Sequence, residues 1–117
     1  MAMDSKQIYM RFLNLIHALD GDVNALHMDL DAKKLLEVVS VQHNLGKPLT
    51  VTDAMALQHI ASPATIHRKL DQLRELGMID TVFEGKNRRT KYLVPTQAAH
   101  DYFDAVGRAM QEAVAQH

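Results

Sequence analysis

Apolar residues recur at helical spacing near the start of the chain. Ile8, Phe12, Leu15, Ile16 and Leu19 form one stripe. Further apolar residues lie beside this stripe, so the segment is apolar on more than one side. The pattern predicts a helix over residues 5–19, ended by Gly21-Asp22 and buried on more than one face.

The C-terminal segment has the same wide apolar face. Thr96 is a suitable cap for a helix that runs to about residue 115. One stripe holds Ala99, Phe103, Val106, Met110 and Val114, and Tyr102, Ala105, Ala109 and Ala113 lie beside it. Either the chain's own domain covers both terminal helices, or a second copy does. We expect a homodimer, because such wide faces exceed what one small domain covers. The expected interface residues are Ile8, Phe12, Leu15, Leu19, Tyr102, Val106, Met110 and Val114.

Three helices are predicted between these ends. Asp29 or Asp31 can cap the first, which runs to about His43 with Leu35, Leu36 and Val39 inward. Gly46 and Pro48 end it. Thr50 or Thr52 begins a short helix of about two turns. Ser62-Pro63 starts a longer helix with Ile66, Leu70 and Leu73 on one stripe, and Gly77 ends it.

Residues 78–94 read as a β-hairpin. Ile79, Val82 and Phe83 indicate one strand, and residues 84–87 have turn chemistry. Thr90, Tyr92 and Val94 alternate as the returning strand, which Pro95 ends. The predicted fold class is mostly α with a small antiparallel hairpin: a winged helix-turn-helix in a single domain over residues 1–117. Its core spans 30–95, with dimerisation helices at 1–22 and 96–117.

Composition narrows the class of protein. A chain of 117 residues suits one domain. The absence of cysteine excludes disulfides, cysteine-ligated zinc and thiol chemistry. No apolar run approaches the roughly 18 residues that a membrane span needs. The polar N-terminus does not resemble a signal peptide. We therefore expect a cytoplasmic protein with no membrane partner.

The distribution of charge points to nucleic acid, although the net charge is −1. Residues 59–91 hold seven lysines and arginines against four acids, whereas the remainder is acidic overall. The hairpin turn, residues 86–91, carries Lys86, Arg88, Arg89 and Lys91 and no acid. DNA affinity depends mainly on local contacts with phosphates, so this concentration matters more than the total. The alternative is a hairpin whose charges only keep the surface soluble.

The helix after Ser62 has a second face without acids. Opposite its apolar stripe lie Ala64, Thr65, Arg68 and Gln72, with His67 and Lys69 at the edges. Arg68 suits guanine or phosphate, Gln72 suits adenine, and Ser62 with the free N–H groups suits phosphate. An ordinary exposed helix face remains the alternative. The predicted DNA-binding residues are Ser62, Ala64, Thr65, His67, Arg68, Lys69, Gln72, Lys86, Arg88, Arg89 and Lys91.

These segments resemble the MarR family of transcription regulators. The resemblance rests on residues 49–53, on the run from Ser62 to Leu73, on residues 76–79 and on residues 87–91. Arg89 falls on the wing arginine that enters the minor groove in that family. Ile60 stands where the family has glycine, and Asn87 stands where it has aspartate. The resemblance implies a homodimeric repressor-type regulator that reads a palindromic site in double-stranded DNA. It also implies release by a small-molecule effector, here of unidentified chemistry.

Other chemistry finds little support. The histidines His17, His27, His43, His59, His67, His100 and His117 include no pair spaced as metal ligands. No nucleophile motif, acid pair or phosphate-binding glycine loop is present. We expect no catalytic residue, no metal, no cofactor and no enzymatic activity. The alternative function is a winged-helix module that binds proteins instead of DNA, which the weakly negative net charge and Ile60 favour.

Overall fold

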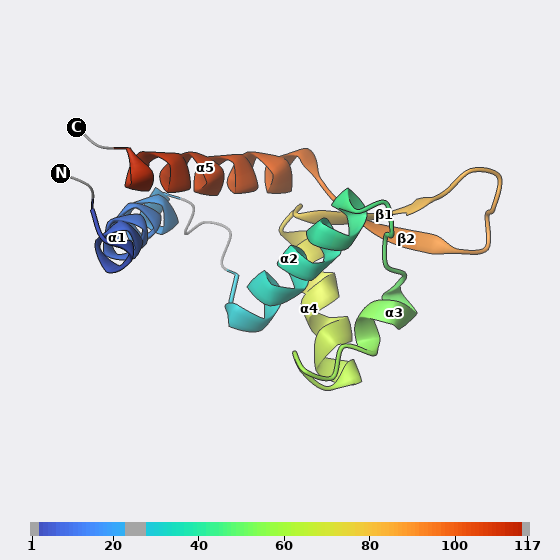
Figure 1. Cartoon of the computed structure of the whole chain (residues 1–117). Helices are drawn as coiled ribbons and strands as arrows, with labels where there is room; N and C mark the ends of the chain where they lie inside the picture. Colours follow the sequence, from blue (N-terminus) through green and yellow to red (C-terminus); the bar gives the residue numbers. More distant parts are fainter. Residues whose placement is uncertain (1–2, 23–27, 116–117) are drawn as a thin grey trace. The chain divides into compact units, whose positions relative to one another are not determined.

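The computed structural model describes residues 3–22 and 28–115. Contacts divide the chain into two units, Met28–Ala99 and a second formed by Met1–His27 with His100–His117. The elements are α1 (Ser5–Asp22), α2 (Leu30–Asn44), α3 (Val51–Met55), α4 (Pro63–Glu75), β1 (Ile79–Phe83), β2 (Lys91–Pro95) and α5 (Gln97–Val114) (Figure 1). The predicted break at Gly21-Asp22 is wrong, because α1 continues through both residues; a glycine costs a helix only about 1 kcal/mol.

Packing of α2 against α4 forms the core of the unit Met28–Ala99. Asp29 caps α2 by accepting a hydrogen bond from the Ala32 N–H at 2.9 Å. From α2, Ala32, Leu35, Leu36 and Val39 are fully buried, and from α4, Ile66, Leu70 and Leu73 are buried. The apolar stripes predicted for these two helices are confirmed.

The short helix α3 begins with a capping box. The Thr50 hydroxyl accepts from the Asp53 N–H, and the Asp53 carboxylate accepts from the Thr50 N–H, both at 3.0 Å. The helix ends at Met55, which makes it shorter than the predicted two turns. The connection to α4 contains a turn in which the Ile60 N–H donates to the Leu57 carbonyl at 2.9 Å. Ile60, which stands where the MarR-family motif has glycine, therefore lies in a hydrogen-bonded turn.

The termini of α4 follow the predicted signals. Ser62 caps the helix by accepting from the Thr65 N–H at 3.3 Å, with Pro63 in the first turn. At the other end Gly77 has a φ of 74°, a left-handed conformation that favours glycine. The direction of α4 is therefore fixed at both ends and along its buried stripe.

The two strands pair antiparallel, from Ile79 opposite Pro95 to Phe83 opposite Lys91. On β2 the buried residues are Leu93 and Pro95, whereas Tyr92 and Val94 are half-buried. The strand β2 begins at Lys91, one residue after the predicted Thr90. It includes Pro95, which was predicted to end it. The Leu93 N–H donates to the Leu49 carbonyl at 2.7 Å, which anchors the hairpin beside the start of α3.

The last helix, α5, starts at the predicted cap. The Thr96 hydroxyl accepts from the Ala99 N–H at 3.3 Å and donates to the Gly77 carbonyl at 2.6 Å. The buried residues are Ala99, Tyr102, Ala109 and Ala113, whereas Met110 and Val114 are more than half exposed. The buried stripe of α5 therefore consists mainly of the residues beside the predicted stripe, Tyr102, Ala109 and Ala113. Within the described ranges, no helix is both long and apolar enough to cross a membrane.

The buried stripe of α4 predicts a large loss of stability on truncation. We expect Leu73→Ala to lower the free energy of unfolding by about 3 kcal/mol, since it removes a fully buried side chain and leaves a cavity. Chemical denaturation measures this change. Exposed Glu75→Ala is the control and should change stability by less than about 0.5 kcal/mol. A loss below about 1 kcal/mol for Leu73→Ala would contradict this core.

Candidate nucleic-acid interface

The exposed face of α4 carries the residues predicted to read DNA. Burial of its apolar stripe turns the opposite face outward. Ser62, Ala64, His67 and Arg68 are exposed, and Thr65, Lys69 and Gln72 are half-buried. Asp71, beyond the edge of this face, lies 3.5 Å from both Arg74 and His67. The Asp71 carboxylate is thus paired with side chains of its own helix.

Hydroxyl groups organise the first turn of this face. The Ser62 hydroxyl donates to Thr65 Oγ1 at 3.0 Å, and Arg68 Nη2 donates to the same oxygen at 3.1 Å. Arg68 is therefore oriented along the helix toward its N-terminus. The positive end of the helix dipole lies at this terminus, so the surface there favours an anion.

The side chain of Lys69 has a partner outside α4. Its Nζ forms an ion pair with the Asp29 carboxylate, at the cap of α2. The Lys69 hydrogen bond holds the pKa of Asp29 below its ordinary value, and the hydrogen bond from the Ala32 N–H lowers it further. This ion pair connects α4 to the start of α2. The position of Lys69 on α4 did not indicate this role.

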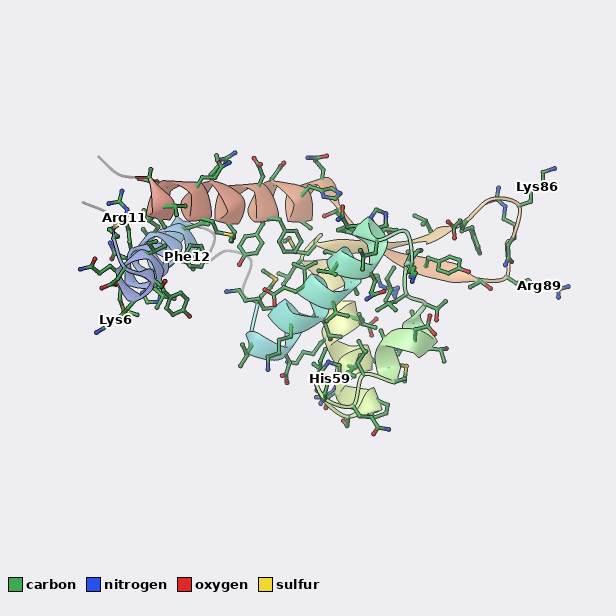
Figure 2. The ribbon with its side chains drawn as sticks, viewed as in Figure 1. Lys6, Arg11, Phe12, His59, Lys86 and Arg89 are labelled. Carbon is green, nitrogen blue, oxygen red and sulfur yellow. The ribbon has the colours of Figure 1, made fainter. Side chains whose placement is uncertain are left out.

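The second predicted element is the wing, residues 84–91, which comprises the turn after β1 and the first residue of β2. Gly85 adopts a φ of 60° within it. Asn87 Oδ1 accepts from the Arg89 N–H at 2.9 Å, so asparagine braces the backbone of the wing arginine. Lys86, Arg88, Arg89 and Lys91 are all exposed. Figure 2 shows Lys86 and Arg89 projecting from the turn, away from the helices of this unit.

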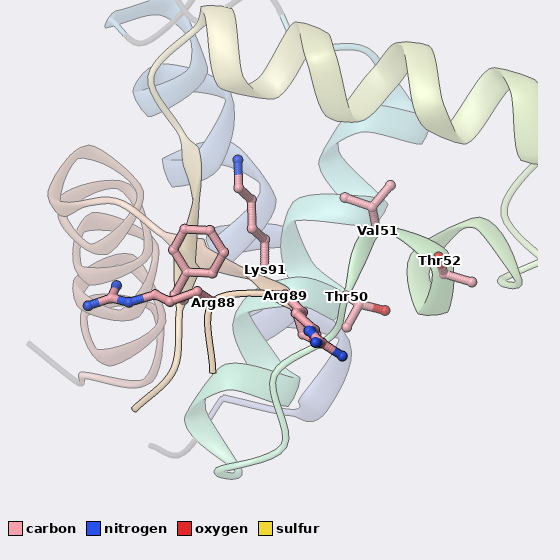
Figure 3. A pocket seen from close by; sticks show the side chains of 8 residues that line it. Thr50, Val51, Thr52, Arg88, Arg89 and Lys91 are labelled. Atoms are coloured by element: carbon pink, nitrogen blue, oxygen red, sulfur yellow. The ribbon is translucent and has the colours of Figure 1, made fainter. Parts of the chain in front are cut away.

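A cleft of about 480 Å³ lies between the wing and the start of α3. Figure 3 shows its lining, which consists of Thr50, Val51, Thr52, Phe83, Arg88, Arg89, Thr90 and Lys91. Three lining residues are cations, three carry hydroxyl groups, and none is acidic. Such a lining suits a phosphate group, because cations attract it and hydroxyls can donate to its oxygens.

Sequence reasoning missed five of these lining residues as parts of the site, namely Thr50, Val51, Thr52, Phe83 and Thr90. Thr50, Thr52 and Thr90 join it through the fold, since the strand pairing brings the wing beside α3. Phe83 was assigned only to a strand, but its ring lies 5.6 Å from the Arg88 guanidinium carbon and 5.5 Å from Lys91 Nζ. An aromatic residue directly before a cationic turn was the available signal.

The unit that contains α1 has an apolar groove. Residues of α1 and α5 line about 450 Å³, namely Ser5, Ile8, Tyr9, Phe12, Met110 and Val114. A neighbouring cavity of about 320 Å³ includes Leu15 and Leu19. Of the predicted interface residues, six line these two hollows, whereas Tyr102 is buried and Val106 is half-buried.

Metal ligands do not gather in the residues that the structure describes. No group of three or more histidines, aspartates or glutamates there is arranged to hold an ion. Of the histidines in the sequence, His27 and His117 lie outside the described residues.

Comparison with family models and with curated protein sequences finds no match. Solved structures do match. A MarR-like transcriptional regulator from Thermotoga maritima superposes with a TM-score of 0.62 at 15% identity, over 95% of this chain and 78% of that chain. MarR superposes with a TM-score of 0.58 at 17% identity, over 95% of this chain and 78% of that chain. The heme sensor protein PefR from Streptococcus agalactiae, in complex with heme, gives 0.52 at 20% identity, over 97% and 81%.

These likenesses establish the fold. The chain has a MarR-like winged-helix fold, mostly helical with a two-stranded antiparallel hairpin, and the predicted fold class is confirmed.

The Asp29–Lys69 ion pair predicts a pH-dependent contribution to stability. The pKa of Asp29 is lowered on folding, so the pair stabilises the fold above the ordinary value of 3.8 and is lost as pH falls through the folded-state pKa. We expect Asp29→Asn, which keeps a good helix cap, to lower the free energy of unfolding at pH 7 by about 0.5 kcal/mol.

Thermal unfolding between pH 2 and 7 measures the effect, with Lys69→Gln and the double variant closing a cycle. The difference between wild type and Asp29→Asn should shrink below pH 3.8. A double variant whose loss equals the sum of the two single losses would contradict a direct pair.

Proposed function

We propose that this chain is a homodimeric, sequence-specific regulator that binds double-stranded DNA. In this proposal α4 enters the major groove and the wing lies on the minor groove. One observation carries it: the acid-free face of α4 and the cationic wing belong to the same unit of a winged-helix fold. Binding through phosphates requires a local cationic surface rather than a positive total charge.

Each element has a role in this mode of binding. On α4, Arg68 and Gln72 face base edges and phosphates, and Thr65 presents a methyl and a hydroxyl group. On the wing, Arg89 enters the minor groove, where its flat guanidinium suits the negative potential. The remaining predicted contacts, Ser62, Ala64, His67, Lys86, Arg88 and Lys91, surround these residues. Lys69 acts mainly through its pair with Asp29.

A second copy of the chain supplies symmetry. The exposed apolar groove of α1 and α5 supports this part of the proposal, because such a groove is stabilised when another apolar surface covers it. A two-fold dimer presents two α4 helices to half-sites about 34 Å apart, the spacing of a palindromic site.

Regulation completes the proposal. The structural likeness to a transcriptional regulator supports a regulatory role, which we take to be repressor-type and cytoplasmic. The similar heme sensor PefR was solved in complex with heme, which supports an effector here as well, of unidentified chemistry. No catalytic step is proposed.

Titration with duplex DNA of random sequence across a salt series tests the DNA-binding function. The wild-type affinity should fall steeply as salt rises, since binding releases counterions. We expect Arg68→Ala and Arg89→Ala each to weaken binding about tenfold, or about 1.4 kcal/mol, and to reduce the salt slope by about one.

Arg11→Ala on α1 is the matched control and should leave affinity unchanged. Absence of wild-type binding at low salt would overturn DNA binding. It would favour the alternative, a winged-helix module that binds proteins.

Disruption of the apolar groove tests the dimer. Met110 is 57% exposed, so Met110→Glu should leave each copy folded while placing a charge where apolar surfaces meet. Light scattering should show a mass near twice 13.2 kDa for wild type and near 13.2 kDa for the variant. The neighbouring exposed residue provides the control, Gln111→Glu, which should remain dimeric. A dimeric Met110→Glu protein with unchanged mass would contradict this interface.

A further inference from the structure

Phe83 lies at the end of β1 with two cations beside its ring. The Arg88 guanidinium carbon is 5.6 Å from the ring centroid, and Lys91 Nζ is 5.5 Å from it. Both distances lie within the range in which the negative face of an aromatic ring attracts a cation. Phe83 is 37% exposed, so its ring serves the surface of the wing and not the core.

The hairpin itself brings these groups together. Phe83 and Lys91 are paired across the strands, and the turn between them returns Arg88 to the same ring. Arg88 and Lys91 both carry positive charge, so they repel one another in the absence of an anion. The ring offsets this repulsion by attracting both groups.

The two adjacent arginines of the wing are directed differently. Figure 3 shows Arg88 and Arg89 pointing in opposite directions, with Arg89 on the side of Thr50. Phe83 thus contacts one arginine of the wing through its ring, while the backbone of the other is held by Asn87.

We propose that Phe83 is a positioning residue, which holds Arg88 and Lys91 as a pair that binds a phosphate of the DNA backbone at the cleft. Arg89 and Lys86 are left to enter the minor groove. This inference rests on the DNA-binding function proposed above. Its physical basis is the entropy that long, mobile side chains lose on binding, which is smaller when a ring has already restricted them.

The first test needs no DNA. In NMR spectra of the full chain, the Arg88 Nε–H and the terminal CH₂ group of Lys91 should show ring-current shifts. These shifts should be lost in Phe83→Leu and retained in Phe83→Tyr, which keeps the ring face. Ordinary shifts for both groups in wild type would overturn the positioning of these cations.

The second test measures affinity for duplex DNA of random sequence. Phe83→Leu should weaken binding about fivefold, the effect expected from two exposed cation–ring contacts, and Phe83→Tyr should restore it. Val82→Leu, at the exposed neighbouring position of β1, is the matched control. In a background that carries both Arg88→Gln and Lys91→Gln, Phe83→Leu should have no further effect.

The outcomes separate the two proposals. If wild type binds DNA and Phe83→Leu binds equally well, the role of Phe83 is overturned and DNA binding stands. An equal loss in Phe83→Leu and Phe83→Tyr, or a loss that persists in the double-glutamine background, also overturns it. If wild type fails to bind, the proposed function is overturned and this role with it.

Discussion

Packing of α4 against α2 is the constraint on which the arrangement of the unit Met28–Ala99 depends. Ile66, Leu70 and Leu73 are buried along one side of α4, and Leu35, Leu36 and Val39 form the buried side of α2. A helix fixed along one stripe has its opposite face fixed as well, because side-chain directions repeat every 3.6 residues. The core therefore determines which side chains of α4 are available to a ligand.

The wing depends on the same core through its strands. Leu93 is buried, and its N–H bonds to the Leu49 carbonyl, so the hairpin is anchored beside α3 while its turn extends into solvent. Cations in the turn are exposed and hydrated, so they carry little desolvation cost. This arrangement explains how a chain with a net charge of −1 presents a positive local surface.

Local signals in the sequence predicted the caps of α4 and α5, whereas contacts between distant residues required the structure. Ser62 and Thr96 act as helix caps as predicted, because each cap depends on a residue only three positions away. The partner of Lys69 is 40 residues distant, and no local pattern identifies it. On α5, helical spacing alone could not determine which of two adjacent apolar stripes is buried, and the structure buries Ala109 while Met110 is exposed.

Chemical-shift mapping of backbone amides during titration with a short duplex tests whether the exposed face of α4 and the wing form one DNA-binding surface. Binding through this surface should give the largest changes in residues 62–72 and 84–91, with α2 nearly unchanged. Changes confined to α1 and α5, or no changes at low salt, would contradict it.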